Sequence, residues 1–288
     1  MALGLNKTKR RIASVRSTQK ITKAMGMVAT VKLKRFKDAH FASEEYFASL
    51  KEAMGRCFAF LNKKDQTPYL EEKREAKGDL VIFLTSDLGL CAAYNSNLFR
   101  FLDQTIDKER DSVIPLGAKG LSHLLHEGGY CLEEAGAYGL SLNFTPREIE
   151  ASAKKLQEAF LVGKYRRIKV IYTHYVNSLS FLPQEYTLLP VKLEYAKKSD
   201  EEWCPPLFEP SAKEQGELLM GQYLSSALSC LINESQLSEQ ASRRNAMDSA
   251  NDNADELLQQ LSVEYNKARQ SSITQEITEV VAGASNAR

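Results

Sequence analysis

Proline is missing from both ends of this 288-residue chain: all eight prolines lie between Pro68 and Pro210. Proline removes a backbone donor and clashes with the preceding helical turn, so a long proline-free segment permits a continuous helix. Residues 1–67 and 211–288 have that freedom, and the middle does not. We therefore expect two long helical arms with a compact insert between them.

Cysteine pairs, net charge and long apolar runs are also lacking. The five cysteines are scattered with no CxxC pair, which favours reduced thiols over disulfides or zinc. The formal charge of +1 gives the whole chain no attraction to nucleic acid. No apolar run approaches the roughly 18–20 residues that a membrane-spanning helix needs. With 43% apolar and 26% charged residues, the composition is that of an ordinary folded protein.

Acidic residues are absent before Asp38, whereas eleven basic residues lie between Met1 and Lys37. Such a start is compatible with a transit peptide, with binding to anionic lipid or with binding to phosphates. Helical spacing of apolar residues nevertheless continues beyond residue 37 together with acidic side chains, which favours a structural arm. The apolar positions are Ile12, Val15, Ile21, Met25, Val28, Leu33 and Phe36, followed by an a/d seam at Phe47, Leu50, Met54, Cys57 and Leu61.

The insert, about Pro68 to Pro210, alternates short β-rich runs with helical patterns. Thr145-Pro146-Arg147-Glu148 is a clear helix start, with an N-cap threonine and a capping-box glutamate. This alternation predicts a small open α/β (Rossmann-like) sheet of doubly wound type. The expected strands are 80–84, 113–116, 168–173 and 181–195, the second weakened by Pro115, and the expected helices are 97–107, 118–126 and 146–162.

The insert lacks the motifs that chemistry on such a fold requires. No GxGxxG follows the first strand, and the chain has no GxxxxGK[ST] and no GxSxG. Thr85-Ser86-Asp87 could hold a phosphate or metal, but a turn around Gly89 is the favoured interpretation. His123 and His126 lie one helical turn apart without a second pair to complete a metal site. We expect no catalytic residues, no cofactor and no metal.

The last arm begins at a second capping-box pattern, Ser211 to Glu214. Between Glu234 and Arg288 nine acidic residues face five basic ones, opposite to the first arm. Opposite charges beside apolar seams favour pairing of the arms, and the intervening insert makes an antiparallel pair the simplest connection. The apolar tip from Ile273 to Ala284 then needs a partner that encloses it. The lean seam of this arm is expected at Ala250, Ala254, Leu257, Leu261, Tyr265 and Ala268.

Three separated motifs resemble the γ subunit of F-type ATP synthases over nearly the whole chain. Gly26 stands where that family usually has glutamate, and Leu88 and Ala92 replace the arginine and the last glycine of its SDRGLCG loop. We expect Gly26 to loosen the first arm locally. The matching stretches are Thr18-Gln19-Lys20-Ile21-Thr22-Lys23-Ala24-Met25 with Met27-Val28-Ala29; Ser86-Asp87-Leu88-Gly89-Leu90-Cys91 with Asn95; and Ser238-Glu239, Arg243, Ala246-Met247, Asn253-Ala254, Tyr265 to Gln270 and Ile273 to Ile277.

The resemblance implies a noncatalytic rotor shaft. Its paired arms would form a long antiparallel coiled coil inside a ring of α and β subunits, with the insert beside ε on the membrane c ring. It implies a peripheral place on the cytoplasmic face of the bacterial inner membrane, or the matrix side in an organelle, with membrane association through the complex only. Contacts to β would fall on Met25, Glu239, Arg243, Arg269, Gln270 and Thr274.

Two other classes remain as alternatives: a noncatalytic coiled-coil tether and a nucleotide-binding α/β protein. The first would carry ATPase motifs at its arm ends, and the second would bind nucleotide on the insert. The expected division is 1–67 for the first arm, 68–210 for the α/β domain and 211–288 for the second arm.

Overall fold

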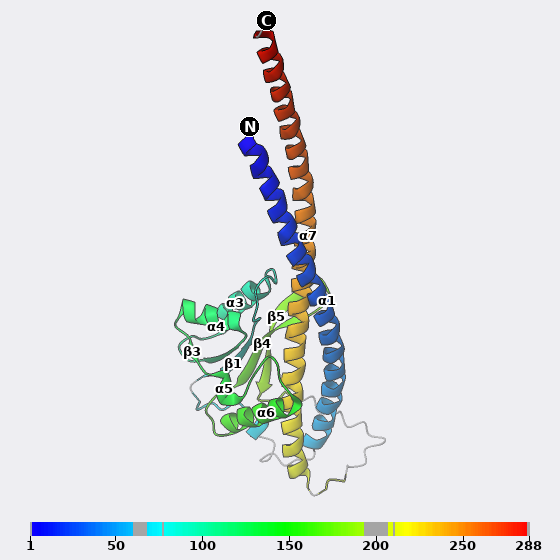
Figure 1. Ribbon diagram of the computed structural model, residues 1–288. Helices are drawn as coiled ribbons and strands as arrows, with labels where there is room; N and C mark the ends of the chain where they lie inside the picture. The colour runs from blue at the N-terminus through cyan, green and yellow to red at the C-terminus, as the bar shows by residue number, and fades with distance from the viewer. Residues whose placement is uncertain (1, 60–67, 77, 193–206, 210, 287–288) are drawn as a thin grey trace. The chain divides into compact units, whose positions relative to one another are not determined.

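A computed structural model describes residues 2–59, 68–76, 78–192, 207–209 and 211–286 (Figure 1). Two long helices, one at each end of the sequence, flank a small α/β fold, as the proline distribution predicts. The elements are α1 (Ala2–Phe58), β1 (Leu80–Leu84), α3 (Tyr94–Thr105), β2 (Ser112–Leu116), α4 (Ala118–Glu127), β3 (Cys131–Leu132), α5 (Ala135–Tyr138), α6 (Pro146–Leu161), β4 (Ile168–Tyr175), β5 (Phe181–Leu189) and α7 (Ala212–Asn286).

The chain divides into two compact units. The paired-helix unit is Met1–Thr30 with Arg243–Arg288, and the α/β unit is Val31–Ser242. Helices α1 and α7 therefore contribute residues to both units. Residues 67 and 210, at which the sequence places its domain boundaries, lie outside the described residues, so those boundaries remain a prediction.

In the paired-helix unit α1 and α7 run antiparallel, and their less exposed positions follow a heptad. Of the apolar residues that recur at helical spacing in the sequence, Ile12 and Val15 lie on this seam, whereas Ile21 and Val28 are 59% and 56% exposed. Polar and small residues occupy the seam at that level instead. The seam of α1 is Leu5, Thr8, Ile12, Val15, Gln19, Thr22, Gly26 and Ala29, and the six positions predicted for α7, from Ala250 to Ala268, are all buried or half-buried.

Two hydrogen bonds cross this polar part of the seam. Gln19 Nε2 donates to Asp255 Oδ1 at 2.6 Å, and Thr22 Oγ1 donates to Asn251 Oδ1 at 2.5 Å. Polar pairs at a and d positions lower stability but fix the register of paired helices. The two helices are therefore held at one axial position, which a purely apolar seam specifies less well.

The α/β unit contains a five-stranded sheet in the order β3-β2-β1-β4-β5. Strands β3, β2, β1 and β4 are parallel, and β5 pairs antiparallel with β4. Side chains of one sheet face, among them Val81 and Phe83, pack with α3 and α4. Those of the other face, among them Ile82, pack with α6, α7 and α1. This doubly wound arrangement confirms the predicted fold class.

Besides shifts of one or two residues at element ends, four details of the insert differ from the prediction. Helix α3 begins at Tyr94 rather than Asn97, β5 ends at Leu189 rather than at residue 195, and β3 and α5 were not predicted. Residues 193–195 lie outside the described residues. The capping box of Thr145 and Glu148 is present, and Glu214 N donates to Ser211 Oγ at the start of α7.

Strand β2 lies inside the sheet although it contains Pro115. On its β1 side Ser112 N donates to Asp79 O, and on its β3 side Glu133 N donates to Val113 O. Backbone N–H groups alternate between the two sides of a strand, so residue 115 faces the β3 side. Because β3 pairs only with Ser112 and Val113, the missing N–H falls beyond its end.

Candidate functional site

The loop after β1 uses its polar side chains to hold itself in place. Thr85, Ser86 and Asp87 were the candidates for a phosphate or metal, and their oxygens bond within the unit. These bonds favour the interpretation of an ordinary turn. Thr85 Oγ1 accepts from Gly120 N and donates to Leu116 O, both at 2.9 Å; Ser86 Oγ donates to Leu88 O at 2.8 Å; and Asp87 Oδ1 accepts from Ala118 N at 3.0 Å.

The turn itself differs from the expected one. Positive φ angles occur at Leu90 (61°) and Ala92 (47°), and Gly89 is not in this region. Side chains make the left-handed region costly, so this loop carries strain at two residues that are not glycine.

The histidines do not form a cluster with other ligands. The ring of His123 stacks on Phe99, with centroids 3.9 Å apart and planes 5° from parallel. Over the described ranges, no group of three or more His, Cys, Asp or Glu side chains could hold a metal ion.

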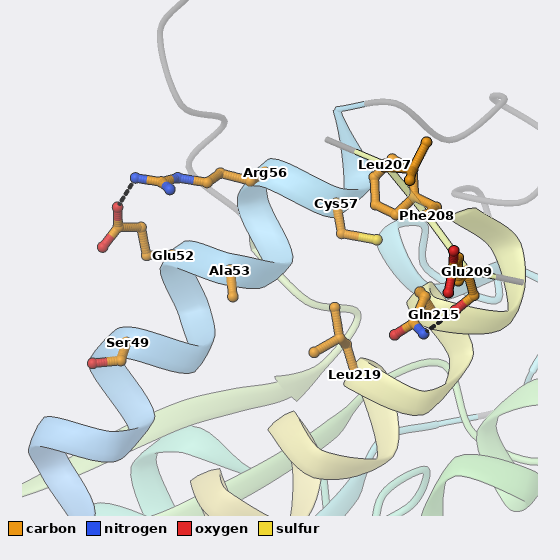
Figure 2. Close-up of a pocket in the computed structure, with 10 residues that line it drawn as sticks. All are labelled: Ser49, Glu52, Ala53, Arg56, Cys57, Leu207, Phe208, Glu209, Gln215 and Leu219. Carbon is orange, nitrogen blue, oxygen red and sulfur yellow. Dashed lines mark hydrogen bonds and ion pairs between the residues drawn. The ribbon is translucent and has the colours of Figure 1, made fainter. Parts of the chain in front are cut away.

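A cavity of about 750 Å³ lies in the α/β unit between the last turns of α1 and the first turns of α7 (Figure 2). Arg56 pairs with Glu52 along α1, and Gln215 Nε2 donates to Glu209 O. Burial raises the pKa of the Cys57 thiol, which therefore stays protonated and is a poor nucleophile or metal ligand.

The place where doubly wound folds bind ligands is occupied by α7. In such folds the ligand crevice lies beyond the carboxyl ends of the strands, where the strand order reverses. Here that point falls between β1 and β4. Ser238 of α7 donates to Thr173 O of β4 at 3.0 Å, and Ser242 donates to Cys91 O, just after β1, at 2.8 Å. A helix of the chain itself thus fills the crevice that a nucleotide would need.

Further polar contacts hold the same stretch of α7. Tyr94 at the start of α3 contacts Ser235 twice, with its hydroxyl 3.1 Å from the carbonyl oxygen and 2.8 Å from Oγ. Burial, with the nearby Glu239 carboxylate, raises the pKa of Tyr94, so the phenol stays neutral. Glu234 accepts from Tyr175 N at 3.1 Å. Only the regular spacing of serines 235, 238 and 242 could have indicated these contacts from the sequence.

The six residues assigned to partner contacts lie on α1 and α7 in different environments. Arg269, Gln270 and Thr274 are exposed, and Met25 is half-buried. Glu239 and Arg243 are buried, at 8% and 6% exposure. The structure therefore presents three of the six on an open surface of α7, within two helical turns of one another.

Exposed apolar side chains accompany them in the paired-helix unit. Ile21, Met27 and Val28 lie outward on α1, and Ile273, Ile277, Val280 and Val281 do so near the end of α7. The four on α7 line one small surface pocket together with Glu276, and clustered exposed apolar side chains indicate an interaction site. None of the helices in the described chain combines the length and apolar character needed to cross a bilayer.

Comparison with known proteins gives matches along the whole chain. The family model ATP-synt, described as ATP synthase, matches residues 4–286. The ATP synthase gamma chain of Mycoplasma mobile is 37% identical, over 97% of this chain and 98% of the relative. That of Chlorobium luteolum is 34% identical over 95% of each chain, and that of Chloroherpeton thalassium is 36% identical over 97% of each.

Solved structures share the fold. A chain of the Euglena gracilis mitochondrial ATP synthase, OSCP/F1/c-ring, has a TM-score of 0.68 at 16% identity and covers 99% of this chain and 95% of its own length. A chain of the Tetrahymena thermophila mitochondrial ATP synthase central stalk/c-ring has a TM-score of 0.53 at 26% identity, over 80% of this chain and 99% of its own length.

Proposed function

Because the chain belongs to the ATP synthase gamma-chain family, we propose that it carries rotation between a membrane ring and the catalytic subunits of a proton-translocating F-type ATP synthase. The likeness to a chain of the Tetrahymena thermophila central stalk/c-ring structure supports a place in the central stalk. The observation that carries the proposal is the antiparallel pairing of α1 with α7 in a chain that matches the family from end to end. The candidate polar loop of the α/β unit is occupied by internal bonds, which supports a mechanical role.

The paired-helix unit has the properties that a shaft needs. Each helix is stiffened by its own hydrogen bonds, and the Gln19–Asp255 and Thr22–Asn251 contacts prevent the two from sliding past each other. A rotating shaft does not change a catalytic site by chemistry. It does so by contacting alternative conformations of that site differently, because a ligand shifts an equilibrium only by its differential affinity.

The partner residues remain those of the family resemblance. We assign contacts with the moving part of β to Met25, Glu239, Arg243, Arg269, Gln270 and Thr274. The exposure of Arg269, Gln270 and Thr274 supports direct contact, whereas Glu239 and Arg243 are buried within the chain and present little surface to a partner. The exposed apolar side chains near the end of α7 would turn inside a sleeve of α and β.

The α/β unit is assigned to the base of the shaft, with ε and the c ring as its partners. The matched Euglena and Tetrahymena structures contain a c ring, which supports this assignment. The chain would be a noncatalytic subunit of a proton-transporting translocase. It would lie peripherally on the cytoplasmic face of a bacterial membrane, or on the matrix side in an organelle.

Reconstitution tests the proposal. The purified chain alone is expected to hydrolyse no ATP and to raise sustained hydrolysis when it is mixed with the α and β subunits of its own complex. A chain truncated after Gln260, which lacks the exposed end of α7, serves as the control and should raise the rate less. An unchanged α/β hydrolysis rate on addition of the intact chain would exclude the shaft role.

A further inference from the structure

We propose that Ser235, Ser238 and Ser242 of α7, together with Tyr94 of α3, fix the rotational angle of α7 on the α/β unit. Torque would then pass between the base and α7 through these positioning residues. The inference rests on the proposed rotor function, because it names where the base holds the shaft.

Apolar packing alone specifies this angle poorly. Between Leu231 and Ser242 nearly every residue of α7 is buried, so the helix is surrounded on most sides. Apolar burial is non-directional and roughly proportional to area, whereas a hydrogen bond weakens steeply as its angle departs from linearity. The polar contacts therefore decide which way each side of α7 faces.

The contacts are buried. Ser238 is 0% exposed and Ser235 is 2% exposed, so water does not replace their partners. Ser238 and Ser242 donate to backbone carbonyls of Thr173 and Cys91, and Tyr94 reaches the Ser235 carbonyl. A buried polar group that loses its hydrogen-bond partner destabilises the protein more than an exposed one does, because water cannot take the partner's place. Turning α7 would break several such bonds at once.

The bonds also oppose rotation in both directions. At about 100° per residue, the three serines project within roughly 60° of one another. Glu234 and Gln236 project about 100° to either side of Ser235. Glu234 accepts from Tyr175 N, and Gln236 Nε2 donates to Leu142 O at 2.8 Å. Three segments of the unit, following β1, ending β4 and preceding α6, thus hold α7 from different sides.

The location explains why the fold can supply this hold. The crevice at the strand-order reversal of a doubly wound sheet presents backbone groups that normally bind a ligand. Here the carbonyls of Cys91 and Thr173 at that crevice receive the serine hydroxyls. The α/β unit therefore binds α7 at the place where other doubly wound folds bind small molecules.

The test uses the complete membrane-bound enzyme with the triple variant Tyr94→Phe, Ser238→Ala, Ser242→Ala. The matched control changes exposed residues of the same types on the two long helices, Tyr46→Phe, Ser249→Ala and Ser262→Ala. In inverted vesicles, ATP hydrolysis and ATP-driven acidification are measured on the same preparation. We expect hydrolysis within about twofold of wild type for both variants, and a protons-per-ATP ratio at least twofold lower for the triple variant alone.

Two results would overturn the inference: an unchanged ratio in the triple variant, or equal losses of hydrolysis and pumping, which indicate only weaker folding. If the triple variant does not assemble, the double variant Tyr94→Phe, Ser242→Ala decides by the same ratio. Wild-type vesicles separate this outcome from failure of the proposed function, since a chain that is not a rotor would give no acidification that depends on it.

Discussion

Ala92 holds a backbone conformation that residues with a side chain rarely adopt. Its φ is 47°, and it is exposed, so no packing compensates for the strain. Glycine has no Cβ to clash in this region. We expect Ala92→Gly to raise the free energy of unfolding by about 0.5–1 kcal/mol, measured by urea denaturation.

The neighbouring Ala93 supplies the control for that change. Its φ is −84°, where alanine is unstrained. Ala93→Gly should therefore lower stability by up to about 1 kcal/mol, because glycine loses more conformational entropy on folding. Equal effects of the two substitutions would contradict the assignment of strain to residue 92.

Asp79 is a buried carboxylate at the start of β1 whose charge is matched by several cations. Its side chain is 2% exposed and lies 3.1 Å from Arg166, 2.7 Å from Arg167 and 3.2 Å from Lys169. Burial works against the charge, but hydrogen bonds from the two arginines outweigh it and lower the pKa of Asp79. Asp79→Asn should lower the free energy of unfolding by about 2 kcal/mol, because the buried Lys169 and the partly exposed Arg166 and Arg167 lose hydrogen bonds to a charged partner.

The pH dependence of that loss follows from the sign of the shift. A carboxyl group with a lowered folded pKa stabilises the protein above its unfolded pKa of about 3.9. The stabilisation disappears as the pH falls through the folded value. The difference between wild type and Asp79→Asn should therefore be largest at neutral pH and shrink below about pH 4. Asp38→Asn, at an exposed position of α1, should change stability by about 0.5 kcal/mol or less throughout.

At the scale of helices, Gly26 is a close contact between α1 and α7 and not a break. Helix α1 continues through it, and a Cβ added there would lie 3.4 Å from Met247 Cβ, an ordinary contact. We expect Gly26→Ala to raise the melting temperature, with a gain of about 1 kcal/mol from helix propensity. Gly221→Ala in α7 should give a similar gain, since nothing lies within 4 Å of its added Cβ.

A larger side chain at position 26 distinguishes the effect of packing between α1 and α7 from the effect of helix propensity. Gly26→Leu also restores helix propensity but must displace Met247. Overpacking typically costs about 1–3 kcal/mol, so this variant should melt below wild type. If leucine stabilised as much as alanine, the two helices would not approach closely at this level.

Helix and strand patterns were predictable where one local rule decided them. Proline distribution gave α1 and α7, and the capping box placed the start of α6. Helical spacing of the apolar residues did not show that Ile21 and Val28 are exposed, because hydrophobicity alone does not indicate which side of α1 faces α7. Strand β2 can lie inside the sheet despite Pro115 because β3 is short, and no residue of β2 indicates the length of β3.

For the molecule as a whole, the family and its motifs were predictable, but the hydrogen bonds that hold α7 on the α/β unit were not. Ser238 and Glu239 were recognised as family residues, yet the partner of Ser238 is a carbonyl 65 positions away, at Thr173. Such contacts follow from the topology of the sheet and not from local spacing. The sequence shows that nucleotide-binding motifs are missing. That α7 fills the crevice where such a fold binds ligands could be seen only in the structure.

Replacing the exposed pair Arg269 and Gln270 tests whether the chain transmits rotation in the complete enzyme. Both side chains lie on the open surface of α7, so replacing them would remove the contacts that we assign to β without disturbing the seam. We expect Arg269→Ala with Gln270→Ala to lower coupled ATP synthesis by roughly tenfold, equivalent to about 1.4 kcal/mol in the barrier, while the assembled complex is recovered in normal yield. Gln259→Ala with Gln260→Ala, also exposed on α7, should leave both quantities near wild type. Loss of assembly before loss of turnover would show that the pair holds the complex together and does not transmit rotation.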